Sequence, residues 1–236
     1  MKEVFEDMTF RLLLVDDHPV VRQGLIHLIN QEEGLSICGE ADDTNQALKA
    51  LEDLNPDMVI VDISLNNSNG LELIKDIKVR NADLPILVLS IHDESLYAER
   101  SLRAGARGYI MKKEPPEKMI EAIHSVLNGE IYISKTMASR MLHSIFARGS
   151  DTGDSSLKRL SDRELEVFQF IGLGRGTRDI ADICHLSIKT IETYYRNIKR
   201  KLNIRKTSEL VQQAVLWVES GQNYKASING PGDRRK

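Results

Sequence analysis

Three short, uninterrupted apolar runs constrain the fold of this 236-residue chain more than any other feature. They span residues 12–15, 58–61 and 86–89, and a polar side chain directly follows each one. Strands that are buried on both faces of a parallel sheet have this continuous apolar pattern, whereas half-exposed strands alternate apolar and polar residues. Amphipathic segments with helical spacing separate the runs. The alternation of strands and helices predicts a doubly wound α/β domain.

Five strand–helix units account for residues 9–128. Weaker apolar segments at 36–40 and 108–111 supply the two remaining strands. The expected strand order is the flavodoxin-like 2-1-3-4-5, in which ligands bind beyond the carboxyl ends of the strands. The predicted helices begin near Pro19, Thr44, Gly70, Glu94 and Pro115, with Thr44 as the expected N-cap of its helix.

Residues 157–220 have helical periodicity throughout and predict a small all-α domain. Ser161 and Glu164 have the spacing of a capping box, which begins a helix. Three further helices are predicted at 177–185, 187–202 and 208–220.

Two segments lack a strong pattern. Residues 129–156 are interpreted as a linker with a short helix at 134–146, because the segment ends in small, polar, turn-forming residues. Residues 221–236 contain Gly-Pro-Gly and three terminal basic residues, which predicts a disordered tail.

Charge divides the chain in the same way. Residues 1–156 hold 16 basic and 26 acidic residues, whereas residues 157–220 have a net charge of +4 and the tail has +3, so that the whole chain has −3. An acidic first half and a basic second half indicate two modules with different partners, and the second partner is expected to be a polyanion.

Composition excludes several classes of protein. The chain has two cysteines, Cys38 and Cys184, far apart, which excludes a disulfide framework and a zinc knuckle and favours a reducing, cytoplasmic setting. No apolar run approaches the roughly 18 residues that a membrane span requires, so no membrane association is expected.

Acidic residues end two strands that are neighbours in the expected order. Asp16 and Asp17 follow the first strand and Asp62 ends the third. Three converging carboxylates need a cation, and oxygen ligands with open water positions suit Mg²⁺. Ser90 and Lys112 follow the fourth and fifth strands at the same edge, where they can bind phosphoryl oxygens.

The chemistry of such a site is phosphoryl transfer to a carboxylate. Asp62 stands alone at its strand end and is the expected nucleophile, whereas Asp16 and Asp17 are better placed as metal ligands. Each acidic residue taken singly could be an ordinary turn residue. Together with Ser90 and Lys112, however, the three aspartates make five polar residues at four successive strand ends. This combination favours the functional interpretation.

The stretches that contain these residues resemble the receiver domain of two-component response regulators. The matching stretches are 13–24, 56–62, 88–90 and 105–112. The resemblance implies that Asp62 accepts a phosphoryl group from a histidine kinase. It also implies that Asp17, Asp62 and the backbone carbonyl of Ser64 bind Mg²⁺, with Asp16 bound directly or through water.

The same resemblance assigns a switch pair. In receivers of this kind, the hydroxyl at the position of Ser90 moves toward the phosphate. The ring at the position of Tyr109 then rotates inward.

The third helix of the second domain has two different faces. A packed stripe is predicted at Ile188, Ile191, Tyr195, Ile198 and Leu202. A basic, hydrogen-bonding face suited to the major groove carries, with its flanks, Lys189, Thr190, Thr193, Arg196, Asn197, Lys199 and Arg200. The turn at Leu186 and Ser187 is short enough for a helix-turn-helix. The alternative is an ordinary solvated helix face.

Residues 157–219 resemble the LuxR-type helix-turn-helix of the NarL/FixJ response regulators, through the stretches 160–167, 179–181, 186–193 and 197–202. The resemblance implies contacts from Lys189, Thr190, Thr193 and Arg196 to bases or phosphates, and phosphate contacts from Lys199, Arg200 and Lys201. The last helix resembles the dimer helix of this subfamily, which assigns a role in dimerisation to Leu210, Val211, Ala214, Val215 and Val218.

The chain is thus interpreted as a transcription regulator that a histidine kinase phosphorylates on Asp62 and that binds double-stranded DNA as a homodimer. It is not expected to be an enzyme beyond self-catalysed phosphoryl transfer to Asp62 and hydrolysis from it. Three alternatives remain: a phosphatase or phosphotransfer enzyme, a phosphorylation-independent DNA-binding protein with a scaffold receiver, and a protein–protein adaptor.

Overall fold

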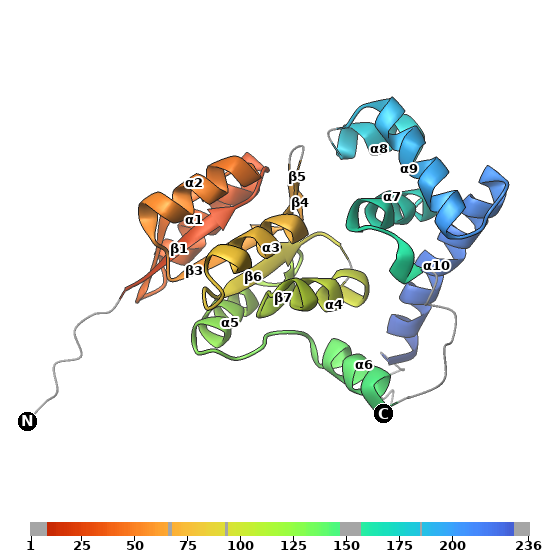
Figure 1. Ribbon diagram of the computed structural model, residues 1–236. Helices are drawn as coiled ribbons and strands as arrows, with labels where there is room; N and C mark the ends of the chain where they lie inside the picture. The colour runs from red at the N-terminus through yellow and green to blue at the C-terminus, as the bar shows by residue number, and fades with distance from the viewer. Residues whose placement is uncertain (1–8, 66–67, 93, 147–156, 185, 229–236) are drawn as a thin grey trace, which may run out of the picture. The chain divides into compact units, whose positions relative to one another are not determined.

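The computed structural model describes residues 9–65, 68–92, 94–146, 157–184 and 186–228 (Figure 1). The chain divides into two compact units, residues 1–148 and 149–236. We call them the front unit and the helical unit and describe each by itself.

The front unit is built on a five-stranded parallel sheet. Its strands lie in the order β2-β1-β3-β6-β7. If the five strands of this sheet are numbered along the chain, the order is 2-1-3-4-5, which confirms the predicted topology. The strands are β1 (Phe10–Val15), β2 (Leu35–Ala41), β3 (Met58–Asp62), β6 (Ile86–Ser90) and β7 (Gly108–Met111), and a small hairpin consists of β4 (Ser64–Leu65) and β5 (Ser68–Asn69).

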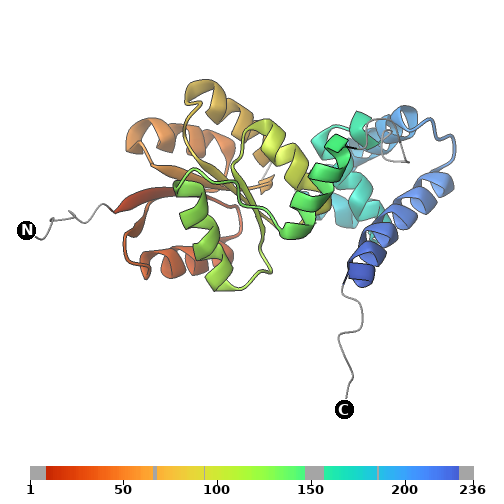
Figure 2. The same cartoon turned by 90° about the horizontal axis from the view of Figure 1, so that it is seen from below.

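Helices cover both faces of this sheet, as Figure 2 shows. Apolar side chains of the strands pack with those of α1 and α5 in one core cluster, and the helices α2, α3 and α4 lie on the other face. All residues of β3 and β6 are buried, as their continuous apolar pattern predicts. The helices are α1 (Pro19–Asn30), α2 (Thr44–Leu54), α3 (Gly70–Arg80), α4 (Glu94–Ala104) and α5 (Pro116–Leu127).

Two helix starts differ by one residue from the prediction. Asp43, not Thr44, is the N-cap of α2, because its carboxylate accepts the backbone N–H of Gln46 at 2.8 Å. Pro115 is the N-cap of α5, and Pro116 takes the first helical position.

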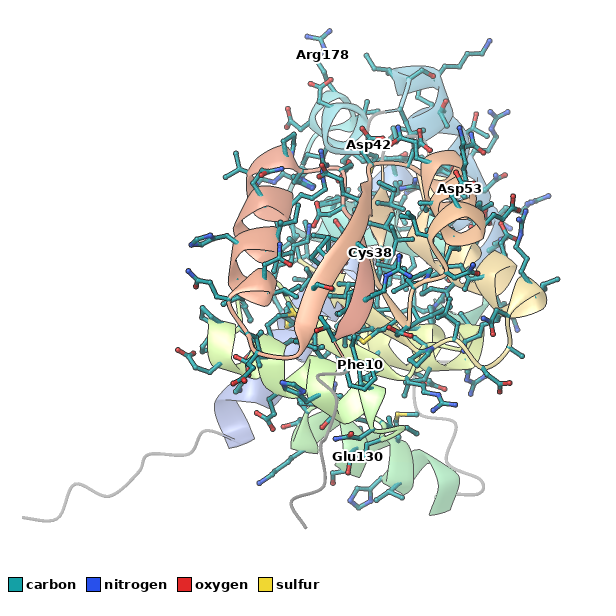
Figure 3. The ribbon with its side chains drawn as sticks, turned by 90° about the vertical axis from the view of Figure 1, so that its left-hand side faces the viewer. Phe10, Cys38, Asp42, Asp53, Glu130 and Arg178 are labelled. Carbon is teal, nitrogen blue, oxygen red and sulfur yellow. The ribbon has the colours of Figure 1, made fainter. Side chains whose placement is uncertain are left out.

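The parallel register brings the strand ends to one edge of the sheet. Val15 pairs with Val61, Asp62 with Leu89 and Ser90 with Met111. In Figure 3, Phe10 lies at one end of the sheet and Asp42, just after β2, lies at the other. The polar residues that follow the strands therefore share the carboxyl edge.

The segment after α5 belongs to the front unit, although it was predicted to be linker. Tyr132 donates its backbone N–H to Arg107 at 3.0 Å and accepts that of Tyr109 at 2.8 Å. The helix α6 (Lys135–Phe146) then packs on α4. Residues 147–156, the rest of the predicted linker, lie outside the described residues.

The helical unit begins with a short 3₁₀ turn, η1 (Leu157–Arg159). Four helices follow: α7 (Asp162–Gly172), α8 (Thr177–Ile183), α9 (Ile188–Lys201) and α10 (Thr207–Ile228). The helix α10 continues beyond Ser220, so the prediction of a tail from residue 221 is wrong as far as Ile228. Residues 229–236 lie outside the described residues.

Among the described residues, no helix is both long and apolar enough to span a membrane.

Candidate functional site

Acidic side chains from two neighbouring strands meet at the carboxyl edge of the sheet. Asp16 follows β1 and Asp62 ends β3, and both are buried. One ligand atom from each of Asp16, Asp17, His18 and Asp62 lies within 4.8 Å of the others. The structure thus brings together the three carboxylates that the sequence analysis placed at the site. Buried carboxylates this close are suited to a hard divalent cation.

Lys112 stands between two of these carboxylates. Its Nζ lies 2.7 Å from Asp62 Oδ2 and 2.6 Å from Asp16 Oδ2. Its backbone N–H donates to the carbonyl of Ser90 at 2.8 Å, which fixes the start of the loop after β7 to the end of β6. Residues from four strand ends therefore converge on one site.

Burial and neighbouring charge have opposite effects on the pKa values of Asp62 and Lys112. Burial raises the pKa of Asp62 to about 6, and the neighbouring Lys112 opposes that rise. For Lys112, burial acts to lower the pKa, but Asp62 and Asp16 outweigh it, and the pKa is raised. The ammonium group thus remains charged and favours the ionised form of Asp62.

Backbone geometry after β3 holds Asp62 in place. The N–H of Ser64 donates to Asp62 Oδ1 at 3.2 Å. Gly70, at the start of α3, donates its N–H to the carbonyl of Ile63 at 2.8 Å. A Cβ atom at Gly70 would lie 2.0 Å from the backbone oxygen of Asp62, so only glycine permits this approach. The role of the Ser64 carbonyl as a metal ligand stays a prediction.

His18 is a member of the cluster that the sequence analysis missed. Its Nδ1 lies 2.7 Å from Asp17 Oδ1 and 3.3 Å from Asp16 Oδ1. Its backbone N–H also donates to Asp16 Oδ1 at 2.8 Å. The sequence feature that could have identified His18 is its position directly after Asp16 and Asp17.

The expected switch pair is connected through His92. Ser90 Oγ accepts the backbone N–H of His92 at 3.1 Å, and Tyr109 Oη donates to the carbonyl of His92 at 2.9 Å. The side chain of Tyr109 is already buried in this structure, with its hydroxyl on the β6–α4 connection. The His92 ring also pairs with Ser64 Oγ at 2.8 Å and stacks on Tyr97.

In the helical unit, α7 is anchored at its first turn. Ser161 and Glu164 form the predicted capping box, with the Ser161 N–H donating to Glu164 Oε2 at 2.7 Å. Lys201 Nζ also lies 2.5 Å from this carboxylate. This ion pair connects α9 to α7, and the phosphate contact of Lys201 stays a prediction.

The helices α8 and α9 form the expected turn. Leu186 donates its N–H to Ala181 at 2.8 Å, and Ser187 caps α9 by accepting the N–H of Thr190 at 3.1 Å. In α9, Ile191 and Ile198 are buried, but Ile188, which was predicted to be packed, is 43% exposed. Ile188 is the first residue of α9.

The polar face of α9 is accessible. Thr193 Oγ1 donates to the carbonyl of Lys189 at 3.0 Å, and Arg196 donates to the same hydroxyl at 3.3 Å. Lys199 Nζ lies 3.3 Å from Thr207 Oγ1 at the start of α10. The residues predicted to contact DNA are all exposed or half-buried: Lys189, Thr190, Thr193, Arg196, Asn197, Lys199 and Arg200.

The structure corrects part of the predicted dimer surface. Leu210 and Ala214 are fully buried within the helical unit, so they belong to its core and cannot form a dimer contact. A Cβ atom at Gly172 would lie 2.6 Å from Val218, so Val218 faces α7. Val211, at 40% exposed, and the half-buried Val215 remain available on α10.

Two family models match the chain. The response regulator receiver domain matches residues 12–124, and the luxR family of bacterial regulatory proteins matches residues 158–214. The oxygen regulatory protein NreC of Staphylococcus epidermidis is 33% identical over 211 residues, covering 87% of this chain and 96% of that protein.

Solved structures of response regulators are also similar to this chain. RcsB of Salmonella enterica serovar Typhimurium, bound to promoter rprA with the phosphomimetic BeF₃⁻, has 28% identity and a TM-score of 0.57, covering 86% of this chain and 97% of that one. A structure of two RcsB dimers bound to two parallel DNAs has 26% identity and a TM-score of 0.53, covering 86% and 97%. The chain therefore belongs to the NarL/FixJ-type two-component response regulators, which are phosphorylation-controlled, DNA-binding transcription regulators with a receiver domain and a LuxR-type helix-turn-helix.

Proposed function

We propose that Asp62 is the phosphoacceptor of this response regulator and that a histidine kinase is its donor. The observation that carries the proposal is the position of Lys112, whose Nζ lies 2.7 Å from Asp62 Oδ2. An oxygen of Asp62 forms the new bond to phosphorus while the bond from phosphorus to the donor's nitrogen breaks. Lys112 can then bind an oxygen of the transferred phosphoryl group.

The donor set fits Mg²⁺. Asp16, Asp17 and Asp62 offer carboxylate oxygens in a small, largely buried cluster, and the Ser64 carbonyl is the proposed fourth ligand. When bound, the cation neutralises the charge that builds up between the carboxylates and the phosphoryl oxygens. The other groups of the site come from the chain itself. The Ser64 N–H orients Asp62, and Ser90 offers a hydroxyl at the same edge of the sheet.

For the helical unit, we propose that α9 enters the major groove of DNA. Lys189 and Arg196 are exposed on its outer face, whereas Ile191 and Ile198 are buried and pack its inner face against the helical unit. Homodimerisation through Val211 and Val215 of α10 is proposed by analogy with the RcsB dimers. Because the ligand is chromosomal DNA, the proposal includes a cytoplasmic location.

The test is phosphorylation with isotopically labelled acetyl phosphate and Mg²⁺. The wild-type chain is expected to gain one acid-labile phosphoryl group, and Asp62→Asn to gain none. Asp53→Asn is the matched control, because Asp53 is exposed on α2 (Figure 3) and is not a member of the acidic cluster. If Asp62→Asn binds DNA and regulates like the wild type, the chain is instead a phosphorylation-independent regulator with a scaffold receiver.

A further inference from the structure

The segment that follows α5 is bonded to the strand of the switch tyrosine. Tyr132 lies along β7, donating its N–H to Arg107 at 3.0 Å and accepting the N–H of Tyr109 at 2.8 Å. Glu130, just before it, lies near the same end of the sheet as Phe10 (Figure 3). The main chain of Tyr109 is therefore fixed to residue 132, while its hydroxyl is bonded to His92.

A second attachment joins the same segment to the first residue of α4. Ser134 Oγ donates to Glu94 Oε1 at 2.5 Å and accepts the N–H of Met137 at 3.1 Å. One hydroxyl thus begins α6 and also holds it to α4. The side chain of Met137 is buried, and α4 and α6 are in contact.

These attachments complete a chain of contacts that starts at the phosphorylation site. Ser90 Oγ accepts the N–H of His92, and Glu94 lies two residues further along the same connection. A movement of Ser90 Oγ toward a phosphoryl group on Asp62 would draw His92 with it. Glu94, at the end of this short connection, would then be displaced from Ser134.

Within residues 135–143 of α6, Met137 is the one buried side chain, at 4% exposed. The helix α5, for comparison, buries four residues against the sheet, Met119, Ala122, Ile123 and Val126. Elements with little buried apolar surface open first in local unfolding. A small displacement of Glu94 can therefore undock α6 without disturbing the core.

We propose that residues 130–146 act as a latch that transmits the phosphorylation state of Asp62. The bond between Ser134 and Glu94 holds α6 on α4 before phosphorylation, and the movement of the β6–α4 connection releases it. The chain leads from α6 to the helical unit, so undocking changes how that unit is tethered. This inference rests on the proposed role of Asp62.

The experiment is hydrogen–deuterium exchange of the full chain, with and without Mg²⁺ and BeF₃⁻ as the phosphoryl mimic. In the wild type, exchange of amides in residues 135–143 is expected to increase by about tenfold when BeF₃⁻ is added. Glu94→Ala removes the acceptor but leaves the Ser134 hydroxyl that caps α6, and it is expected to show that increase without BeF₃⁻, as is Ser134→Ala. Ser139→Ala, exposed on the same helix, is the matched control and should exchange like the wild type.

Each outcome decides a different point. Wild-type exchange in Glu94→Ala would overturn the latch. A BeF₃⁻ response at residues 58–65 without one in α6 would also overturn it, while leaving Asp62 as the phosphoacceptor. If BeF₃⁻ changes no part of the front unit and Asp62 takes no label, the proposed function fails and the latch with it. In support of the latch, Ser134→Ala without phosphoryl donor should bind DNA as BeF₃⁻-treated wild type does.

Discussion

Gly70 and Asp62 approach each other so closely that a Cβ atom at position 70 would lie 2.0 Å from the backbone oxygen of Asp62. The same Cβ atom would lie 2.8 Å from Cα of Ile63. Both obstacles are backbone atoms at the end of the strand that carries the proposed phosphoacceptor. Relief would require the start of α3 to move away from β3.

Gly70→Ala is therefore expected to destabilise the front unit by about 1 to 3 kcal/mol, the usual cost of overpacking. Urea unfolding followed by circular dichroism measures this effect. The control is Gly24→Ala in α1, where an added Cβ meets nothing within 4 Å and helix propensity predicts a gain of about 0.5 to 1 kcal/mol. Equal stability of the two variants would contradict the steric argument.

Lys112→Met is expected to lower the rate of Asp62 phosphorylation by about 100-fold or more, because an ammonium that binds the phosphoryl oxygens is removed. Initial rates with labelled acetyl phosphate at saturating Mg²⁺ measure the loss. Lys113→Met removes an exposed neighbouring charge and should leave the rate nearly unchanged. Full activity of Lys112→Met would show that the lysine only balances the buried carboxylates.

Lys189→Ala and Arg196→Ala are expected to weaken DNA binding. Each substitution that removes a phosphate contact should also reduce the slope of log K against log salt concentration by about 1. Binding of the full chain to promoter fragments across a salt series gives both quantities. Arg103→Ala, at an exposed position on α4 of the front unit, is the control. Unchanged affinity in both α9 variants would favour the adaptor interpretation.

Glu164 makes the stability of the helical unit depend on pH. Burial acts to raise its pKa, but hydrogen bonds from Lys201 and the Ser161 backbone outweigh it, so the pKa lies below the ordinary value of 4.5. A carboxylate with a lowered pKa stabilises the folded state above its unfolded-state pKa. That contribution is lost as the pH falls from about 4.5 through the folded-state pKa.

At neutral pH, Glu164→Gln should reduce the free energy of unfolding by about 1 to 3 kcal/mol, and the difference from wild type should shrink in acid. Trp217, the single tryptophan, packs 5.4 Å from Phe168 and reports this unit by its fluorescence. Glu219→Gln, at an exposed position on α10, is the control. A difference that persists undiminished well below pH 4.5 would contradict the assignment.

The sequence by itself determined the local structure and the edge at which the site lies. Continuous apolar runs identified the buried strands, and parallel strands bring Asp16, Asp62, Ser90 and Lys112 to one edge whatever the details of packing. The capping box at Ser161 depends on residues three apart, and so it could be read directly from the chain.

Only the tertiary structure decided contacts between residues that are far apart in the chain. Helical periodicity marks an apolar side of α10, but packing against α7 buries Leu210 and leaves Val211 exposed. The sequence predicted only a phosphate contact for Lys201, and the ion pair with Glu164 depends on how α9 packs on α7. The attachment of Ser134 to Glu94 joins residues 40 positions apart. Periodicity reports which side of an element is apolar, whereas the partner of each side chain depends on how the elements pack.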